Sequence, residues 1–128
     1  MIVEALMNGG YVPVSKGDFV FLSYRSVEVE FASKLARDLI RLGINLWMDR
    51  LEIRPGQNWI RVLQQAINDC AALIAVLSPE YTQSEYCSRE LSRAVLMRRP
   101  VVPLLIETIP DPDWPFEIQG QHYLDFRE

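Results

Sequence analysis

The sequence predicts an α/β domain built on a parallel sheet, and three features lead to this expectation. Short apolar runs alternate with segments of helical periodicity, which is typical of strands joined by crossover helices. The run Ala71–Leu77 is apolar throughout, as expected for a central strand covered on both faces. The chain has 128 residues, 49% of them apolar and 23% charged, which suits a single globular core.

The strands and helices are expected in regular alternation. Apolar runs predict strands at Phe19–Leu22, Ile44–Met48, Ala71–Leu77, Val101–Ile106 and Tyr123–Phe126, with a proline-rich loop at Pro110–Pro115. Ser26 is expected to cap the first helix, and Gly43 to end it, because glycine readily adopts the left-handed conformation found at helix ends. A second helix is expected after a cap at Gln57 or Asn58, and a third over about Ser84–Met97.

Residues 1–17 are interpreted as a leader, and the folded domain is expected over residues 18–128. The stretch Met1–Ser15 has no Lys or Arg and no long apolar run, so it is neither a signal peptide nor a membrane span. We therefore expect a cytoplasmic protein with no membrane partner. The chain stops directly after the last expected strand, where such folds add a covering helix, so we expect a domain of a longer protein.

Charge and cysteine content argue against two classes of protein. The net charge of −4 is spread along the chain, whereas nucleic-acid binding needs clustered cations. The densest basic stretch follows the third helix and is interpreted as a solvated face: Arg89, Arg93, Arg98 and Arg99. Cys70 and Cys87 have no metal-binding spacing with the single histidine, His122, so no metal site is expected. Two buried thiols fit a reducing compartment.

One residue interrupts the apolar side of the third helix. Successive residues of a helix are about 100° apart, and this places Glu90 between Tyr86 and Ala94, inside the apolar arc. A carboxylate in that position is at least partly desolvated, which is costly unless other groups are arranged around it. Two interpretations stay open at this point. Glu90 pairs with a core arginine or a backbone amide, or it lines a pocket with Tyr86 as an aromatic wall.

A pocket has a natural location in such a sheet. Ligands bind beyond the carboxyl ends of the strands where the strand order reverses, here between the first and third strands. That point would be lined by Ser23, Tyr24 and Arg25, by Ser78 after the third strand, and by the helix that carries Glu90. Arg25 could hold phosphate oxygens, or it could be an ordinary surface cation. No glycine-rich phosphate loop follows the first strand, so hydride transfer and NTP hydrolysis are not supported.

Three motifs, taken in order, resemble those of TIR domains. They are Phe21–Arg25 at the first strand, Trp47–Asp49 with Leu51–Gly56 at the second strand and the long BB loop, and Leu77–Tyr81 with Ser84–Leu91 at the third strand and the next helix. The resemblance runs from about Asp18 to Phe126 and is nearest to the bacterial-type, NAD-cleaving branch of that family.

The resemblance implies a flavodoxin-like three-layer fold with a five-stranded parallel sheet of order 2-1-3-4-5, its final helix missing from this chain. It implies that Glu90 is the catalytic residue for cleavage of the nicotinamide–ribose bond of NAD+, by hydrolysis or cyclisation. NAD+ would be the substrate, and no cofactor is expected. By the same resemblance the substrate site comprises Ser23, Tyr24, Arg25, Leu51, Arg54, Trp59, Ser78 and Tyr86. In the family, the position of Tyr86 is often Trp.

The resemblance also implies self-association. The BB loop, Asp49–Asn58, would gate the pocket and contact a neighbouring copy, and a fused or partner sensor domain would cluster the TIR domains in defence against phage. Trp47 is interpreted as a core residue. The alternative function is a non-catalytic adaptor that works through TIR–TIR contacts and needs no glutamate; the position of Glu90 favours the enzyme.

A phospho-receiver domain shares the sheet order, but it needs paired acidic residues after the first strand and an aspartate at the end of the third. Ser23, Tyr24 and Ser78 stand there instead, so this class is set aside.

Overall fold

The computed structural model describes residues 19–48 and 58–127 of the chain, without the Trp59 side chain. The predicted leader and most of the BB loop, with Leu51 and Arg54, lie outside the described residues.

Five strands form one sheet in the order β2-β1-β3-β4-β5. They are β1 (Phe19–Ser23), β2 (Asn45–Met48), β3 (Ala72–Leu77), β4 (Val101–Leu105) and β5 (Leu124–Asp125). Every neighbouring pair is parallel, so the predicted parallel sheet and its order are confirmed. All six residues of β3 are buried, as the uninterrupted apolar run indicated. The strand order reverses between β1 and β3, which pair from Val20 with Ala72 to Ser23 with Ala75.

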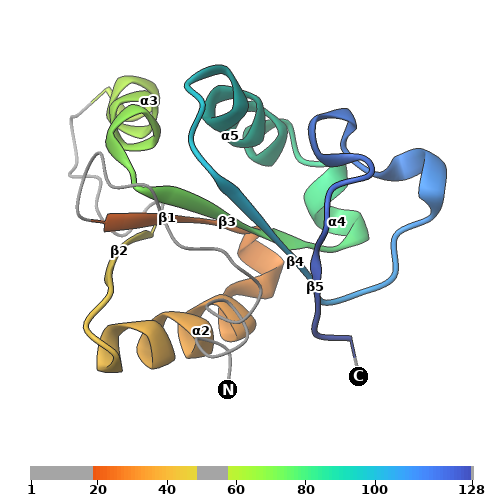
Figure 1. Ribbon diagram of the computed structural model, residues 1–128, viewed down its shortest axis with the longest axis horizontal. Helices are drawn as coiled ribbons and strands as arrows, with labels where there is room; N and C mark the ends of the chain where they lie inside the picture. Colours follow the sequence, from red (N-terminus) through yellow and green to blue (C-terminus); the bar gives the residue numbers. More distant parts are fainter. Residues whose placement is uncertain (1–18, 49–57, 128) are drawn as a thin grey trace.

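Helices cover both faces of the sheet and complete three layers (Figure 1). Helix α2 (Val29–Arg41) lies on one face, and α3 (Trp59–Asp69) and α5 (Glu85–Leu96) lie on the other. The buried residues accordingly fall into two clusters, one between the sheet and α2 and one between the sheet and α3 and α5. Within the two described segments, 19–48 and 58–127, no helix is long and apolar enough to cross a membrane.

The side chains of β1 alternate between these two clusters. Phe21 packs in the cluster beneath α3 and α5, and it stacks on Trp47 of β2 with the ring centroids 4.9 Å apart. Val20, Leu22 and Tyr24 belong to the cluster beneath α2. Because side chains alternate in direction along a strand, Ser23 points to the same face as Phe21. The strand therefore delivers Ser23 to the side of the sheet where α5 lies.

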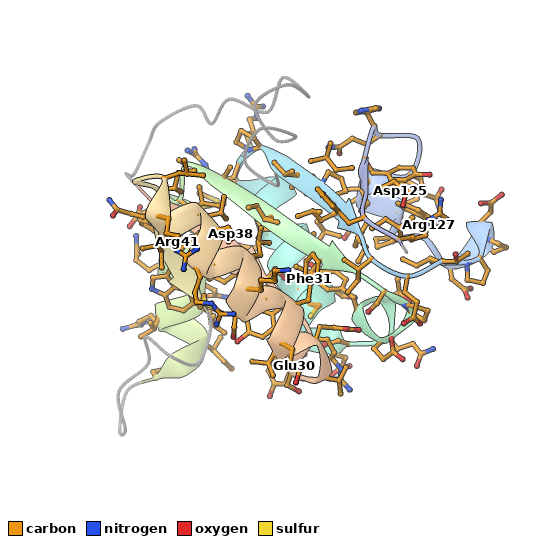
Figure 2. The ribbon with its side chains drawn as sticks, turned by 90° about the horizontal axis from the view of Figure 1, so that it is seen from below. Glu30, Phe31, Asp38, Arg41, Asp125 and Arg127 are labelled. Carbon is orange, nitrogen blue, oxygen red and sulfur yellow. The ribbon has the colours of Figure 1, made fainter. Side chains whose placement is uncertain are left out.

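The first helix begins later than the sequence predicted. Ser26 does not act as an N-cap: it starts a 3₁₀ turn, η1 (Ser26–Glu28), and α2 follows from Val29 without a side-chain cap. The residues expected in the first turn of the helix, up to Glu28, form this tighter turn instead, where the chain leaves the sheet. Figure 2 shows α2 across the sheet, with Glu30 at its N-terminal end and Arg41 at its C-terminal end. Both charges suit the helix dipole.

The starts of α3 and α5 were predicted correctly. The Asn58 side chain accepts a hydrogen bond from the Arg61 amide at the start of α3. The Ser84 hydroxyl accepts one from the Cys87 amide at the start of α5. Besides η1, three short helical turns were not predicted, because single turns carry no hydrophobic period. They are α4 (Pro79–Thr82), and η2 (Asp111–Asp113) and η3 (Phe116–Ile118), of which η2 lies inside the expected proline-rich loop.

Helix α2 ends at a glycine, as predicted. Gly43 has a φ of +83°, and the amides of Gly43 and Ile44 donate to the carbonyl oxygens of Ile40 and Leu39. This is the hydrogen-bond pattern of a glycine-terminated helix. The glycine therefore matters for its backbone conformation, and a Cβ added to it would meet no atom within 4 Å.

The two cysteines are free thiols, and both are buried. Burial raises the pKa of Cys70 to about 11, so this thiol stays neutral.

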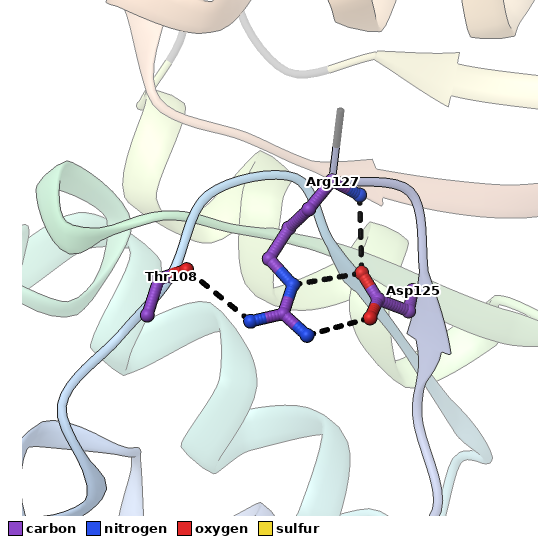
Figure 3. Close-up of polar contacts among 3 residues, drawn as sticks. All are labelled: Thr108, Asp125 and Arg127. Atoms are coloured by element: carbon purple, nitrogen blue, oxygen red, sulfur yellow. Dashed lines mark hydrogen bonds and ion pairs between the residues drawn. The ribbon is translucent and has the colours of Figure 1, made fainter.

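The last strand is tied to the loop after β4 by one arginine (Figure 3). The Arg127 guanidinium donates to both carboxylate oxygens of Asp125, at 2.9 and 2.6 Å, and to the Thr108 hydroxyl at 3.2 Å. These hydrogen bonds lower the pKa of Asp125 to about 2. The pair is exposed to solvent, so it orients the end of the chain more than it stabilises the fold.

We expect Gly43→Ala to lower the free energy of unfolding by about 1 kcal/mol, because alanine is strained at a positive φ. Urea denaturation measures this loss. Gly43→Asn is the matched control and should lose less, because asparagine tolerates the left-handed conformation. Equal stability of the parent and the alanine variant would contradict the assignment.

We expect the Asp125 carboxyl to titrate near the value of about 2 in the folded protein and to return toward the ordinary range in Arg127→Ala. Because the folded-state pKa is lowered, the contribution of this pair is present above the ordinary aspartate pKa and is lost as pH falls toward the folded value. Carboxyl-carbon NMR during an acid titration measures the midpoint. Arg41→Ala, on the distant helix α2, should leave it unchanged.

Candidate functional site

Glu90 lies in the middle of α5 with 4% of its surface exposed. Cys87, Leu91 and Ala94, its neighbours on the same side of the helix, are buried as well. The helical-wheel prediction that this carboxyl group is desolvated is therefore confirmed. A carboxylate can be tolerated at such a position only if polar groups are supplied to it.

Two hydroxyl groups are arranged in series behind the Glu90 carboxylate. The Ser23 hydroxyl donates to Oε1 of Glu90 over 2.7 Å. The same Ser23 oxygen lies 2.8 Å from the hydroxyl oxygen of Tyr81 in α4. Ser23 is fully buried and Tyr81 is 1% exposed, so water does not compete for these hydrogen bonds.

The direction of this chain of hydrogen bonds follows from the number of protons. A serine hydroxyl has one proton, and Ser23 uses it to donate a hydrogen bond to Glu90. Tyr81 must then donate to Ser23, so the chain runs from Tyr81 through Ser23 to Glu90. Burial raises the pKa of Tyr81 well above its usual range, and the nearby Cys87 and Glu90 add to the effect. The phenol therefore keeps its proton and remains a donor.

A cavity of about 310 Å³ opens beside Glu90, between α3 and α5. Its α3 side is formed by Ile60, Leu63 and Gln64. On the α5 side, Tyr86 and Glu90 line it together with Arg89 and Arg93 and two serines. Tyr86 is 42% exposed and lines the cavity. The structure therefore brings the predicted catalytic carboxylate and the predicted aromatic wall to one hollow.

The remaining predicted site residues lie in different surroundings. Arg25 follows Ser23 by two residues and is half-buried, and its buried Nε has no hydrogen-bond partner within the described part of the chain. Tyr24 packs in the cluster beneath α2, on the face of the sheet away from Glu90. Ser78 is buried and caps α4, where its hydroxyl accepts from the Tyr81 amide. The Trp59 side chain lies outside the described residues.

Sequence reasoning missed Tyr81, although a signal was present. Ser78 and Pro79 are a favourable N-cap and first residue for a helix, and Tyr81 comes two residues later. The role of Ser23 was also readable from the alternation in β1, since Phe21 and Ser23 share a face.

A larger cavity, of about 580 Å³, lies near the end of β4. Leu105, Trp114 and Tyr123 contribute to its walls, and it includes none of the predicted site residues. Among residues 19–48 and 58–127 there is no cluster of His, Cys, Asp and Glu side chains that could hold a metal ion. Of these two cavities, the one beside Glu90 contains the predicted catalytic residue.

The arrangement at Glu90 is that of a buried carboxyl group held by a hydrogen bond at the edge of a cavity. One carboxylate oxygen, Oε1, accepts a hydrogen bond from Ser23, the other, Oε2, is buried, and Glu90 is among the residues that line the cavity. Such a carboxylate can stabilise a developing positive charge or accept hydrogen bonds from sugar hydroxyls.

The sheet order and the helices on both faces define a flavodoxin-like α/β domain, with a buried carboxylate near its switch point. Within this class the chain belongs to the TIR domain family, whose profile matches residues 20–128. The sequence is 32% identical over 93 residues to the probable 2' cyclic ADP-D-ribose synthase BdTIR of Brachypodium distachyon. That match covers 71% of this chain, which spans 42% of the length of the relative.

Solved structures agree with the family. The TIR domains of the activated Roq1 resistosome, which recognises the pathogen effector XopQ, align with a TM-score of 0.67 and 27% identity. The alignment covers 75% of this chain and 61% of that one. The TIR domain of the Toll-related receptor TRR-2 from Hydra magnipapillata aligns with a TM-score of 0.74 and 22% identity, over 84% and 82% of the two chains. The second likeness supports the fold alone.

We expect Ser78→Ala to lower the free energy of unfolding by about 1 kcal/mol, because the amide of Tyr81 loses its acceptor at the start of α4. Chemical denaturation measures the change. Ser88→Ala, an exposed position on α5, is the control and should stay within about 0.5 kcal/mol of the parent. An unchanged stability for Ser78→Ala would show that the capping hydrogen bond is not important.

Proposed function

We propose that this domain cleaves the nicotinamide–ribose bond of NAD+, with Glu90 as the catalytic residue. The observation that carries the proposal is the buried Glu90 carboxylate at the cavity between α3 and α5. Membership of the TIR domain family supports it, as does the similarity to a relative named as a probable 2' cyclic ADP-D-ribose synthase. NAD+ is the substrate, and the proposed reaction requires no further cofactor.

The chemistry suits a single carboxylate. Nicotinamide leaves NAD+ as a neutral molecule from a cationic precursor, so its departure needs no general acid. The bond that breaks joins nicotinamide nitrogen to the ribose C1′, and the ribose becomes oxocarbenium-like as the electron pair leaves with nicotinamide. A fixed anion beside the ribose stabilises that charge and accepts hydrogen bonds from its hydroxyls. Water or a hydroxyl of the same molecule then forms the new bond to C1′ and releases its proton to solvent, giving a linear or cyclic product.

Other residues of the site are proposed to orient the substrate. The guanidinium of Arg25, with a buried Nε that has no hydrogen-bond partner within the described segments, is suited to phosphate oxygens. The half-exposed ring of Tyr86 offers a flat apolar surface to a base. The predicted contacts of the bound nucleotide also include Leu51, Arg54 and the Trp59 side chain.

We further propose that activity depends on self-association through TIR–TIR contacts, including the BB loop over Asp49–Asn58. A sensor domain, fused or separate, would cluster the domains in response to infection, in the manner of bacterial-type members that act against phage. The similarity to the TIR domains of the Roq1 assembly, an activated resistosome, supports clustering as the mode of activation. The proposed location is the cytoplasm.

The test is nicotinamide release from NAD+ by the domain, concentrated or artificially clustered, beside Glu90→Gln. We expect release by the parent and a loss on the order of 10²-fold or more in the variant, because the amide has the same shape but no charge. Chromatography of the products measures the release. Circular dichroism establishes that both proteins are folded.

Glu85→Gln is the matched control. It lies in the first turn of the same helix and is exposed, so its activity should equal that of the parent. Equal release from the parent and Glu90→Gln would exclude Glu90 as the catalytic group. No release from either protein, even when clustered, would favour the alternative function of a non-catalytic adaptor.

A further inference from the structure

We infer that Tyr81 and Ser23 are positioning residues that act in series to hold the Glu90 carboxylate in its reactive orientation. This inference rests on the proposed function, since it concerns the same carboxylate. Neither hydroxyl needs to touch the substrate. Their effect is transmitted through the hydrogen bonds from Tyr81 to Ser23 and from Ser23 to Oε1 of Glu90.

The geometry shows why these groups are suited to positioning rather than to substrate contact. Ser23 is fully buried, and Tyr81 is 1% exposed. Neither residue lines the cavity beside Glu90. Both hydrogen bonds have the ordinary length of a bond between a hydroxyl group and an oxygen acceptor, 2.8 and 2.7 Å.

Each hydroxyl is itself held by a rigid element. Ser23 ends β1, which pairs with β2 on one side and β3 on the other. Tyr81 lies in α4, whose first turn is capped by Ser78. A glutamate side chain has three rotatable bonds, so a carboxylate held only from its own helix could turn within the cavity. The series arrangement fixes it from two other elements.

The two hydroxyls are not equivalent. Ser23 donates a hydrogen bond to the carboxylate, whereas the hydrogen bond of Tyr81 reaches it through Ser23. The Ser23 hydroxyl accepts a hydrogen bond from Tyr81, which polarises it and strengthens the hydrogen bond that it donates to Glu90. Loss of the Tyr81 hydroxyl should therefore weaken the bond between Ser23 and Glu90 without abolishing it. Once Ser23 is gone, the Tyr81 hydroxyl has no route to Glu90. The losses of kcat caused by the two substitutions should therefore not add up in the double variant.

The experiment measures kcat and KM for NAD+ with the clustered domain. We expect Ser23→Ala to lower kcat by about 10- to 100-fold, because a misplaced catalytic group costs turnover more than binding. Tyr81→Phe should lower kcat by about 2- to 10-fold, the effect of one neutral hydrogen bond. Both should leave KM within about twofold, since neither residue binds the substrate. The double variant should lose no more than Ser23→Ala alone.

Controls separate positioning from general damage. Ser33→Ala, in α2 on the opposite face of the sheet from α5, and Tyr123→Phe, at the other cavity, remove the same groups and should keep the parent kcat. Ser23→Thr restores a hydroxyl and should recover most of the activity. If its extra methyl group prevents folding, Ser23→Cys provides a smaller, weaker donor and should give an intermediate kcat. An unchanged kcat in Ser23→Ala, or losses in the two single variants that multiply in the double variant, would overturn the series arrangement.

A readout without turnover separates this inference from the proposed function. A double-mutant cycle on unfolding free energy, with Ser23→Ala and Glu90→Gln, measures whether the two side chains interact in the folded protein. A clear coupling with no NAD+ cleavage by the parent would overturn the proposed function and support the hydrogen-bonded arrangement. Cleavage by the parent that depends on Glu90, together with no coupling and no kcat effect of Ser23→Ala, would overturn the positioning role alone.

Discussion

The hydrogen bond from Ser23 to Glu90 joins the sheet to α5 at a point closed to solvent on both sides. Without a donor, a carboxylate among the buried residues of α5 would oppose the packing of that helix on the sheet. With Ser23 in place, the same helix face can be apolar along most of its length and still carry a charged group. The orientation of the carboxylate and the chemistry proposed for it depend on this contact.

The parallel sheet makes such a contact possible. Crossover connections return every strand in the same direction, so the carboxyl ends of β1 and β3 lie side by side, and the residues that follow them meet at one edge. Ser23 comes from the end of β1, and Tyr81 from the short helix after β3. Chain segments 58 residues apart thereby meet in one hydrogen bond.

Most of the fold could be predicted, because apolar runs and helical periods extend over many residues. The same reasoning identified Glu90, since a charged residue on an apolar helix face conflicts with its neighbours. It did not identify Tyr81, because α4 is a single turn, nor the 3₁₀ turn that begins at Ser26, because local propensity does not determine how the chain leaves a sheet. Tyr24 and Ser78 were predicted at the right edge of the sheet, but strand alternation and helix capping turn their side chains to packing and to a backbone amide.

The deep burial of Ser23 and Tyr81 has a consequence for how the site is lost. Surface-built sites come apart by local opening, well before the rest of the molecule. Here two of the three linked residues sit in the most protected layer, on a central strand and beneath α5, so they separate only when that layer opens. Heating should therefore abolish the organised carboxylate and the global fold in one transition, and the lifetime of the site is the lifetime of the folded chain.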